Sequence, residues 1–119
     1  METDGRLDRQ MQQENLRAQV QAPVQSVVDT QVYLGDPVTE REGEDLVVTI
    51  PATANVLYLD QDGQLQGTIA RMETTCRTTA AENCVCRATA HPVGEAFAVP
   101  SGDGLEVRCA VAVTMDTQD

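Results

Sequence analysis

Apolar and polar side chains alternate with a period of two residues along most of the chain. The longest uninterrupted case lies near the C-terminus, where every second residue is apolar: Leu105, Val107, Cys109, Val111, Val113 and Met115. Successive side chains of a β-strand point to opposite faces, so this pattern predicts a strand with one face against a core. Alternating or β-branched segments predict further strands at residues 16–22, 26–34, 46–59, 64–76, 84–90 and 94–99.

Turn-forming residues separate these predicted strands. Glycine, proline and polar residues cluster at residues 35–37, 42–45, 77–83 and 100–104. Asp62-Gly63 predicts a tight hairpin of type I′, whose two central residues both need positive φ. His91-Pro92 predicts a kink, and Pro51 predicts an edge or a bulge, because proline donates no ladder hydrogen bond.

The predicted strands follow one another as hairpins, and no segment has the pattern of a crossover helix. This order favours an all-β fold, in which an antiparallel meander closes into a sandwich or a partly open barrel. Residues 1–14 are polar and rich in glutamine. We therefore expect a short polar N-terminal tail over residues 1–14, flexible or with one helical turn, and a single β domain over residues 15–119.

The charge balance argues against binding to nucleic acids. The chain has 119 residues, with 19 acidic and 8 basic side chains and a net charge of −11, and its arginines are scattered along the sequence. Proteins that bind a phosphate backbone need a concentrated basic surface. No apolar run approaches the ~20 residues of a membrane span, and residues 1–5 lack the features of a signal peptide. We therefore expect a cytoplasmic protein without membrane insertion.

Three segments carry a resemblance to a known family. Residues 56–65, Val-Leu-Tyr-Leu-Asp-Gln-Asp-Gly-Gln-Leu, resemble the most recognisable hairpin motif of the SPOCS domain. Cys86-Arg87-Ala88 leading to residues 94–99, and then residues 104–108, follow in the order of that family. Together with residues 24–34, the resemblance covers about residues 20–116. SPOCS domains occur in spore-coat assembly proteins of spore-forming Firmicutes.

The resemblance implies a structural role in the spore envelope. Proteins of this family act as non-catalytic assembly factors, and they often carry repeated β-rich domains followed by a LysM module. This sequence holds one such unit and no LysM-like segment, so peptidoglycan binding is not implied. The resemblance implies a stand-alone unit or a fragment of a longer protein, with residues 16–22 as an edge strand or part of a preceding repeat. The implied partners are other spore-envelope proteins on the mother-cell side.

Four cysteines, Cys76, Cys84, Cys86 and Cys109, are candidates for metal binding. Zinc takes about four soft ligands in a tetrahedral arrangement, usually from cysteine pairs in turns. Thiols two residues apart on an extended strand, such as Cys84 and Cys86, are separated by nearly ~7 Å. Free cysteines are also among the most buried residues and pack as small apolar side chains. We expect the thiols to belong to the core, with a disulfide and a zinc site as the alternatives.

No combination of residues predicts an active site. His91 is the only histidine and has no nucleophile near it in the sequence, whereas nucleophilic catalysis needs an activated attacker and an orienting group together. Asp60 and Asp62 begin a calcium-like pattern, but the glycine and glutamate positions of an EF-hand loop hold Leu65 and Arg71. We therefore predict a protein that is not an enzyme and needs no cofactor.

The densest acidic cluster is a candidate for protein binding. Glu40, Glu42, Glu44 and Asp45 surround one predicted turn, and clustered charge steers association with a basic partner in a salt-dependent way. A second mechanism is edge-strand addition, in which a partner segment pairs with residues 16–22 or 26–34. The leading hypothesis is a non-enzymatic scaffold of spore-coat assembly. The alternative hypothesis is a small ligand- or zinc-binding β-barrel that uses its cysteine thiolates.

Overall fold

The structure is a computed structural model that describes residues 7–80 and 84–118. Its described residues form strands and turns, and none belongs to a helix that could span a membrane. The strands are β1 (Leu7–Gln21), β2 (Val24–Leu34), β3 (Val38–Glu42), β4 (Asp45–Asp60), β5 (Leu65–Thr79), β6 (Val85–Ser101) and β7 (Gly104–Gln118).

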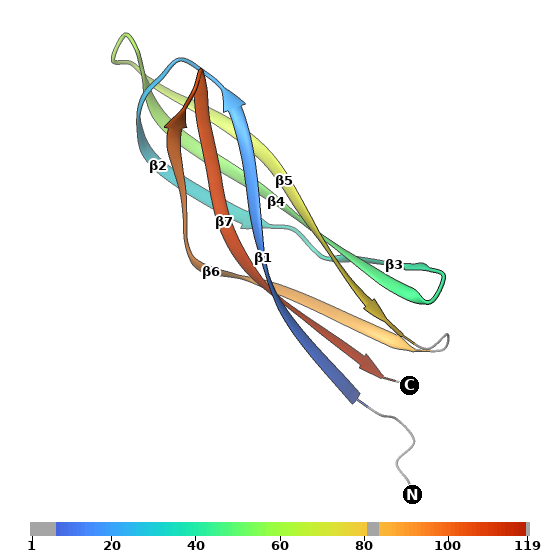
Figure 1. The fold of residues 1–119 in the computed structure, drawn as a ribbon. Coiled ribbons are helices and arrows are strands. Elements are labelled where there is room, and N and C mark those ends of the chain that lie inside the picture. The colour runs from blue at the N-terminus through green and yellow to red at the C-terminus, as the bar shows by residue number, and fades with distance from the viewer. Residues whose placement is uncertain (1–6, 81–83, 119) are drawn as a thin grey trace, which may run out of the picture.

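The strands form two antiparallel sheets that pack face to face (Figure 1). In the first, here named the β7 sheet, β7 lies between β1 and β6. In the second, the β4 sheet, β5 pairs with one edge of β4, and β2 and β3 pair in succession with the other edge. At the sides of the sandwich β1 lies beside β5 and β2 beside β6. The predicted all-β antiparallel sandwich is confirmed, and the two sheets do not close into a barrel.

The core is aliphatic and lies between the inner faces of β4 and β7. Every second residue of β7 from Leu105 to Met115 is buried, as the alternation predicts. Opposite them, Val48 and Ile50 of β4 are fully buried. Burying one aliphatic side chain of this size contributes about 1.5–3 kcal/mol. The β-branched side chains that dominate this core also fit the pleated surface of a sheet well.

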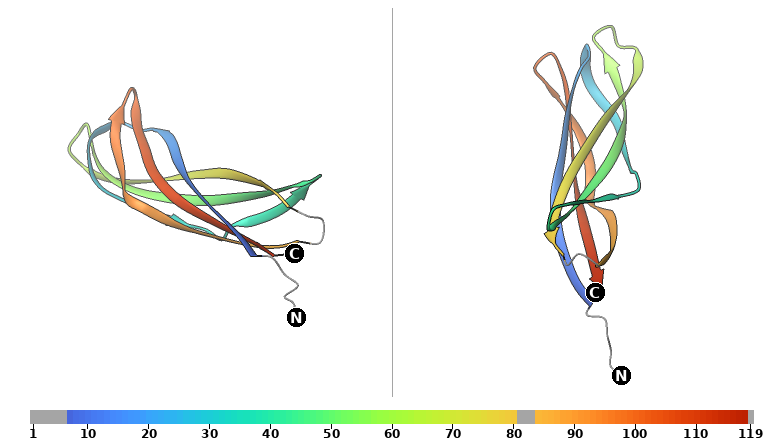
Figure 2. Two further views of the ribbon diagram at one scale, coloured as in Figure 1. Left: turned by 60° about the horizontal axis from the view of Figure 1, so that its bottom comes forward. Right: turned by 90° about the vertical axis from the view of Figure 1, so that its right-hand side faces the viewer.

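The sandwich is long and narrow, with principal extents of 69, 25 and 17 Å. Its strands run along the length, and both sheets bend along it (Figure 2). The β4–β5 hairpin lies at one end of the molecule (Figure 1). The β3–β4 hairpin lies at the other end, together with the beginning of β1 and the end of β7. The shape therefore separates the two hairpins by most of the length of the molecule.

Residues 7–14 form the first half of β1, so the prediction of a polar tail or a helical turn is wrong for them. β1 begins at Leu7 and pairs with β7 over its whole length without a register shift. The ladder uses backbone groups and needs no apolar side chains, and polar residues such as Gln12 and Glu14 stay partly exposed. Residues 1–6 of the predicted tail lie outside the described residues.

The β4–β5 hairpin is present at Asp62-Gly63, but its turn differs from the predicted type I′. Gly63 has a φ of 78°, whereas no described residue other than glycine has a positive φ. The N–H of Gly63 donates to the carbonyl of Asp60 at 3.0 Å, and the N–H of Asp60 donates to the carbonyl of Gln64 at 2.9 Å. A turn followed by a left-handed glycine is typical of three-residue hairpin loops. The third loop residue therefore removes the need for a positive φ at Asp62.

Pro51 lies in the central strand β4, not at the predicted edge or bulge. β2 pairs with β4 from Ala52 onwards and β3 pairs up to Thr49, so Pro51 faces the gap between these two strands. Its carbonyl accepts a hydrogen bond from the N–H of Gly35 in that gap at 2.8 Å. The nitrogen and oxygen of one strand residue point to the same side. The nitrogen of Pro51, which carries no hydrogen, therefore also faces the gap, and no hydrogen bond of the ladder is lost there.

The kink predicted at His91-Pro92 is wrong, because both residues pair regularly with β7. The irregularity of β6 lies between Val93 and Phe97, where Gly94 has a φ of 70°. Pro92 is tolerated because β6 is an edge strand, where a missing donor costs no ladder bond on the open side. The bulge interrupts the pairing of β6 with β7 between Val93 and Phe97.

Candidate interaction surface

The acidic cluster predicted from the sequence lies on the β3–β4 hairpin. The strands pair at Glu42↔Asp45, and Gly43 and Glu44 form the turn between them. Gly43 has a φ of 62°, a region that favours glycine, and glycine at the first turn position is typical of type II′ hairpins. A side-chain carbon placed on Gly43 would meet no atom within 4 Å. The turn therefore projects into solvent.

Three of the four predicted carboxylates share the outer face of the β4 sheet. Strand pairing places Glu40 beside Val47 and Glu42 beside Asp45, and Val47 and Asp45 are two residues apart on β4. The side chains of Glu42 and Asp45 are 55% and 40% exposed, and Glu40 and Glu44 are exposed as well. The structure thus brings the four predicted residues together at one exposed end of the molecule.

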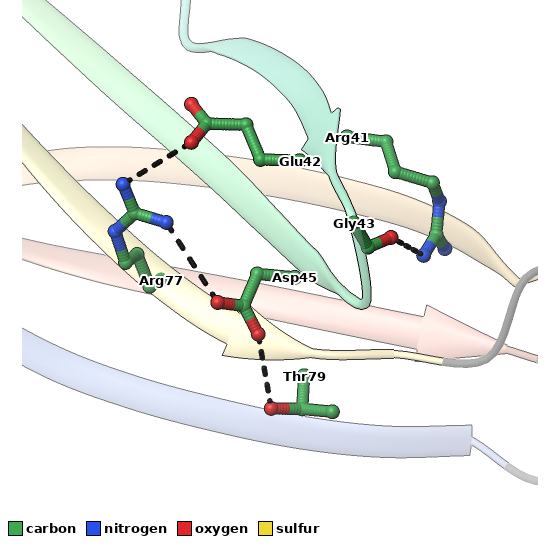
Figure 3. Close-up of polar contacts among 6 residues, drawn as sticks. All are labelled: Arg41, Glu42, Gly43, Asp45, Arg77 and Thr79. Atoms are coloured by element: carbon green, nitrogen blue, oxygen red, sulfur yellow. Dashed lines mark hydrogen bonds and ion pairs between the residues drawn. The ribbon is translucent and has the colours of Figure 1, made fainter.

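Arg77 of β5 links the two strands of the hairpin (Figure 3). Its Nη2 lies 3.3 Å from Glu42 Oε1, and its Nη1 lies 3.7 Å from Asp45 Oδ2. The Thr79 hydroxyl donates to Asp45 Oδ1 at 3.3 Å. Exposed ion pairs contribute only about 0–1 kcal/mol each to stability. Their effect here is to fix the positions of two carboxylates without covering them.

Arg41 holds the backbone of the turn. Its Nη1 donates to the carbonyl of Gly43 at 3.4 Å and to the carbonyl of Ala80 at 3.2 Å. The N–H of Ala80 in turn donates to the carbonyl of Glu44 at 3.1 Å. The turn is therefore bound to the segment that follows β5. A turn held in this way presents its carboxylates in a fixed arrangement, which reduces the entropy lost on binding.

Arg77 and Thr79 are not predicted from the sequence to belong to this surface, since both lie far from the acidic run along the chain. The register of β4 with β5 is unbroken from Leu59↔Leu65 to Asp45↔Thr79. The predicted two-residue turn would instead pair Gln61 with Gln64 and place Thr79 opposite Leu46, whereas the observed three-residue loop places Thr79 opposite Asp45. The third residue of the loop therefore decides that Arg77 and Thr79 share the outer face of the β4 sheet with Asp45.

The four cysteines do not form a common site. Cys76 and Cys109 are buried on β5 and β7, whereas Cys84 and Cys86 near the start of β6 are only half-buried, and all are free thiols. The core prediction thus holds for the first two alone. Burial raises the pKa of Cys76, Cys86 and Cys109, which disfavours the thiolate that zinc requires. Within residues 7–80 and 84–118, no three metal-ligating side chains are gathered.

The loop around Asp60 is organised by hydrogen bonds to its carboxylate. The N–H groups of Asp62 and Gln64 both donate to Oδ1 at 2.9 Å, and the Gln66 side-chain amide donates to Oδ2 at 3.0 Å. These hydrogen bonds lower the pKa of Asp60, and the bond from the backbone of Gln64 has the largest effect. A carboxylate that accepts three hydrogen bonds from the protein is accounted for by a structural role in the turn.

The side chain of His91 is exposed on β6.

The two segments predicted for edge-strand addition both lie on edge strands. β1 pairs only with β7, and β2 pairs only with β4, among the described strands. β2 carries two register shifts, and such bulges are typical of edges that are protected against pairing with another chain. β1 has no shift, but it lies beside β5.

No protein-family model, curated protein or solved structure matches this chain.

Proposed function

We propose that this chain is a non-enzymatic protein-interaction module that binds a basic partner through its acidic hairpin. The observation that carries the proposal is the exposed group of Glu40, Glu42, Glu44 and Asp45, in which Arg77 fixes two carboxylates that remain 55% and 40% exposed. Fixed charges of one sign raise association rates and orient a partner of opposite charge. The hairpin is therefore suited to recognise a basic surface.

The resemblance of residues 20–116 to the SPOCS domain supports a scaffold role in spore-coat assembly. In this proposal the chain holds another component of the spore envelope on the mother-cell side. The body of the molecule, 69 Å long with the hairpin at one end, suits a spacer between two attachment points. The separation of the cysteines argues against the alternative of a zinc-binding barrel.

The proposal is tested by capture from an extract of sporulating cells of a spore-forming Firmicute. The immobilised wild-type chain is compared with the variant Glu40→Gln, Glu42→Gln and Glu44→Gln, named the hairpin variant. Asp45 is kept because, unlike Glu42, it accepts a hydrogen bond from Thr79 in addition to its ion pair with Arg77. A matched control, Asp29→Asn, Asp36→Asn and Glu73→Gln, removes the same charge from exposed positions elsewhere.

We expect mass spectrometry to identify spore-envelope proteins that bind to the wild-type chain and to the control but not to the hairpin variant. Circular dichroism should show the same β structure in all three proteins, because the changed side chains are exposed. Equal capture by the wild-type chain and the hairpin variant would contradict the proposal.

A further inference from the structure

Four of the eight arginines lie on the outer face of the β7 sheet. Residues with even numbers on β7 point away from the core, since its buried apolar residues, from Leu105 to Met115, have odd numbers. Pairing places Arg9 and Arg87 on either side of Asp116, and Arg17 beside Arg108. This face is therefore rich in arginine, although the whole chain carries a charge of −11.

Two acidic side chains of this face, Glu106 and Asp116, are paired with its arginines. Arg17 Nε and Arg108 Nε lie 2.6 and 2.7 Å from the same oxygen, Oε2 of Glu106. The side chain of Glu106 is 10% exposed, whereas those of Arg17 and Arg108 are 67% and 50% exposed. Arg9 covers Asp116 in a similar way, at 2.7 Å. A partner that approaches Glu106 or Asp116 thus meets guanidinium groups before it meets these two carboxylates.

A groove of about 680 Å³ opens on this face beside Arg17 and Arg108. It lies where the bulge at Gly94 separates β6 from β7. Ala110 of β7 belongs to its lining and pairs with Asn15 of β1 and Val93 of β6. Its remaining lining includes Phe97, which is 49% exposed, and Glu95. The groove thus combines two exposed guanidinium groups with an aromatic ring and one exposed carboxylate, that of Glu95.

The acidic hairpin has the charge that the two guanidinium groups of this groove would bind. Its turn is narrow and projects into solvent at Gly43, with Glu42 and Glu44 on either side. Arginine binds carboxylates through paired, charge-assisted hydrogen bonds. Two copies of the chain repel each other overall, but this repulsion is screened beyond about 10 Å at 0.1 M salt, whereas close pairs are screened less. Local complementarity therefore decides whether two copies bind.

We infer that the groove beside Arg17 and Arg108 binds the acidic hairpin of a second copy of this chain. The inference rests on the proposed function, since it names a partner of the same hairpin. Each copy uses its hairpin on one neighbour and its groove on another, so the contact is heterologous. Such contacts repeat along a line unless the rotation between copies closes a ring. The chain would thus build linear or ring assemblies, as a scaffold requires.

Sedimentation velocity at low and at high salt tests this inference over a range of concentrations. The groove variant, Arg17→Gln with Arg108→Gln, keeps the hairpin, and the hairpin variant keeps the groove. We expect the average mass of the wild-type chain to rise with concentration and to fall with salt. Each variant alone should associate at least about tenfold more weakly, because one partner of each ion pair is missing.

A mixture of the two variants gives a result that loss of folding cannot produce. The hairpin of the groove variant can bind the groove of the hairpin variant, so we expect a one-to-one complex that does not grow further. The control Arg71→Gln with Arg87→Gln, which removes two exposed arginines away from the groove, should associate like the wild-type chain. A wild-type chain that stays monomeric, or variants that associate as it does, would overturn the inference.

The outcomes separate this inference from the proposed function. If the wild-type chain is monomeric while the hairpin variant still loses its captured partners, the inference fails and the proposed function stands. If the hairpin variant loses self-association but captures the same partners as the wild-type chain, the inference stands. In that case the acidic hairpin binds only further copies of this chain, and the proposed capture of another envelope protein fails.

Discussion

Asp60 Oδ1 accepts a hydrogen bond from the backbone N–H of Gln64 at 2.9 Å, across the loop that joins β4 to β5. Asp60 is 8% exposed, so its loss would leave three partly buried hydrogen-bond donors without their acceptor. We expect Asp60→Ala to lower the urea midpoint of unfolding clearly more than Asp62→Ala, which changes an exposed residue of the same loop. Equal midpoints for the two variants would show that the carboxylate of Asp60 does not organise the hairpin.

Stability should fall at acidic pH because of Glu106. Hydrogen bonds from Arg108 and then Arg17 lower the pKa of Glu106 from 4.5 to about 2. The pKa of Glu106 is lower in the folded state than in the unfolded state. Its contribution to stability is therefore complete at pH values above the unfolded-state pKa and is lost as the pH falls through the folded-state pKa. The pKa values of Asp60 and Asp116 are lowered too and act in the same direction.

The variant Glu106→Gln isolates this effect. It lacks the titrating group, so the difference in urea midpoint between wild type and variant should shrink as the pH is lowered from about 4.5 to about 2. Urea titrations followed by circular dichroism at a series of pH values measure this difference. A difference that stays constant over the range would contradict the assigned ion pairs with Arg17 and Arg108.

Two isoleucines on opposite faces of the β4 sheet give a matched test of the core. Ile50 is fully buried, whereas Ile69 is 63% exposed. We expect Ile50→Ala to lower the free energy of unfolding by about 2–5 kcal/mol, and Ile69→Ala to change it by no more than about 0.5 kcal/mol. Urea denaturation measures both values. Similar losses at the two positions would mean that the buried face of the sheet is assigned wrongly.

The cysteines should react in two classes. Cys84 and Cys86 are half-buried, whereas Cys76 and Cys109 are buried. Burial raises the pKa of Cys86 as well as those of Cys76 and Cys109, so access to the thiol separates the two classes. The thiolate is the reactive form. We therefore expect an alkylating reagent to modify Cys84 and Cys86 in the folded protein and to reach Cys76 and Cys109 only on unfolding. Peptide mass spectrometry identifies the sites, and early modification of Cys109 would contradict the fold.

The sequence predicts most strands because the signal for a half-buried strand is local. Leu105 to Met115 alternate strictly, and the structure buries the apolar half of them. Residues 7–14 carry no such signal. They become a strand because β7, which is more than 80 residues away along the chain, supplies a backbone partner for each of them. Long-range pairing of this kind, and the division into two sheets, cannot be obtained from periodicity.

The same distinction applies to the candidate surface. Glu40, Glu42, Glu44 and Asp45 are close in the sequence, and a single turn is enough to gather them. Arg77 reaches Glu42 and Asp45 only because β5 pairs with β4 along its full length. The arginine-rich face was missed because its members are scattered along the chain. They meet only when β1 and β6 pair with β7.

The salt dependence of binding to a captured basic partner tests the role of the acidic hairpin most directly. The dissociation constant is measured at a series of salt concentrations for the wild-type chain, the hairpin variant and the matched control. We expect affinity to fall steeply with salt for the wild-type chain and the control, and the hairpin variant to bind more weakly with a shallower salt dependence. Equal affinity and equal salt dependence for all three proteins would contradict binding through the hairpin.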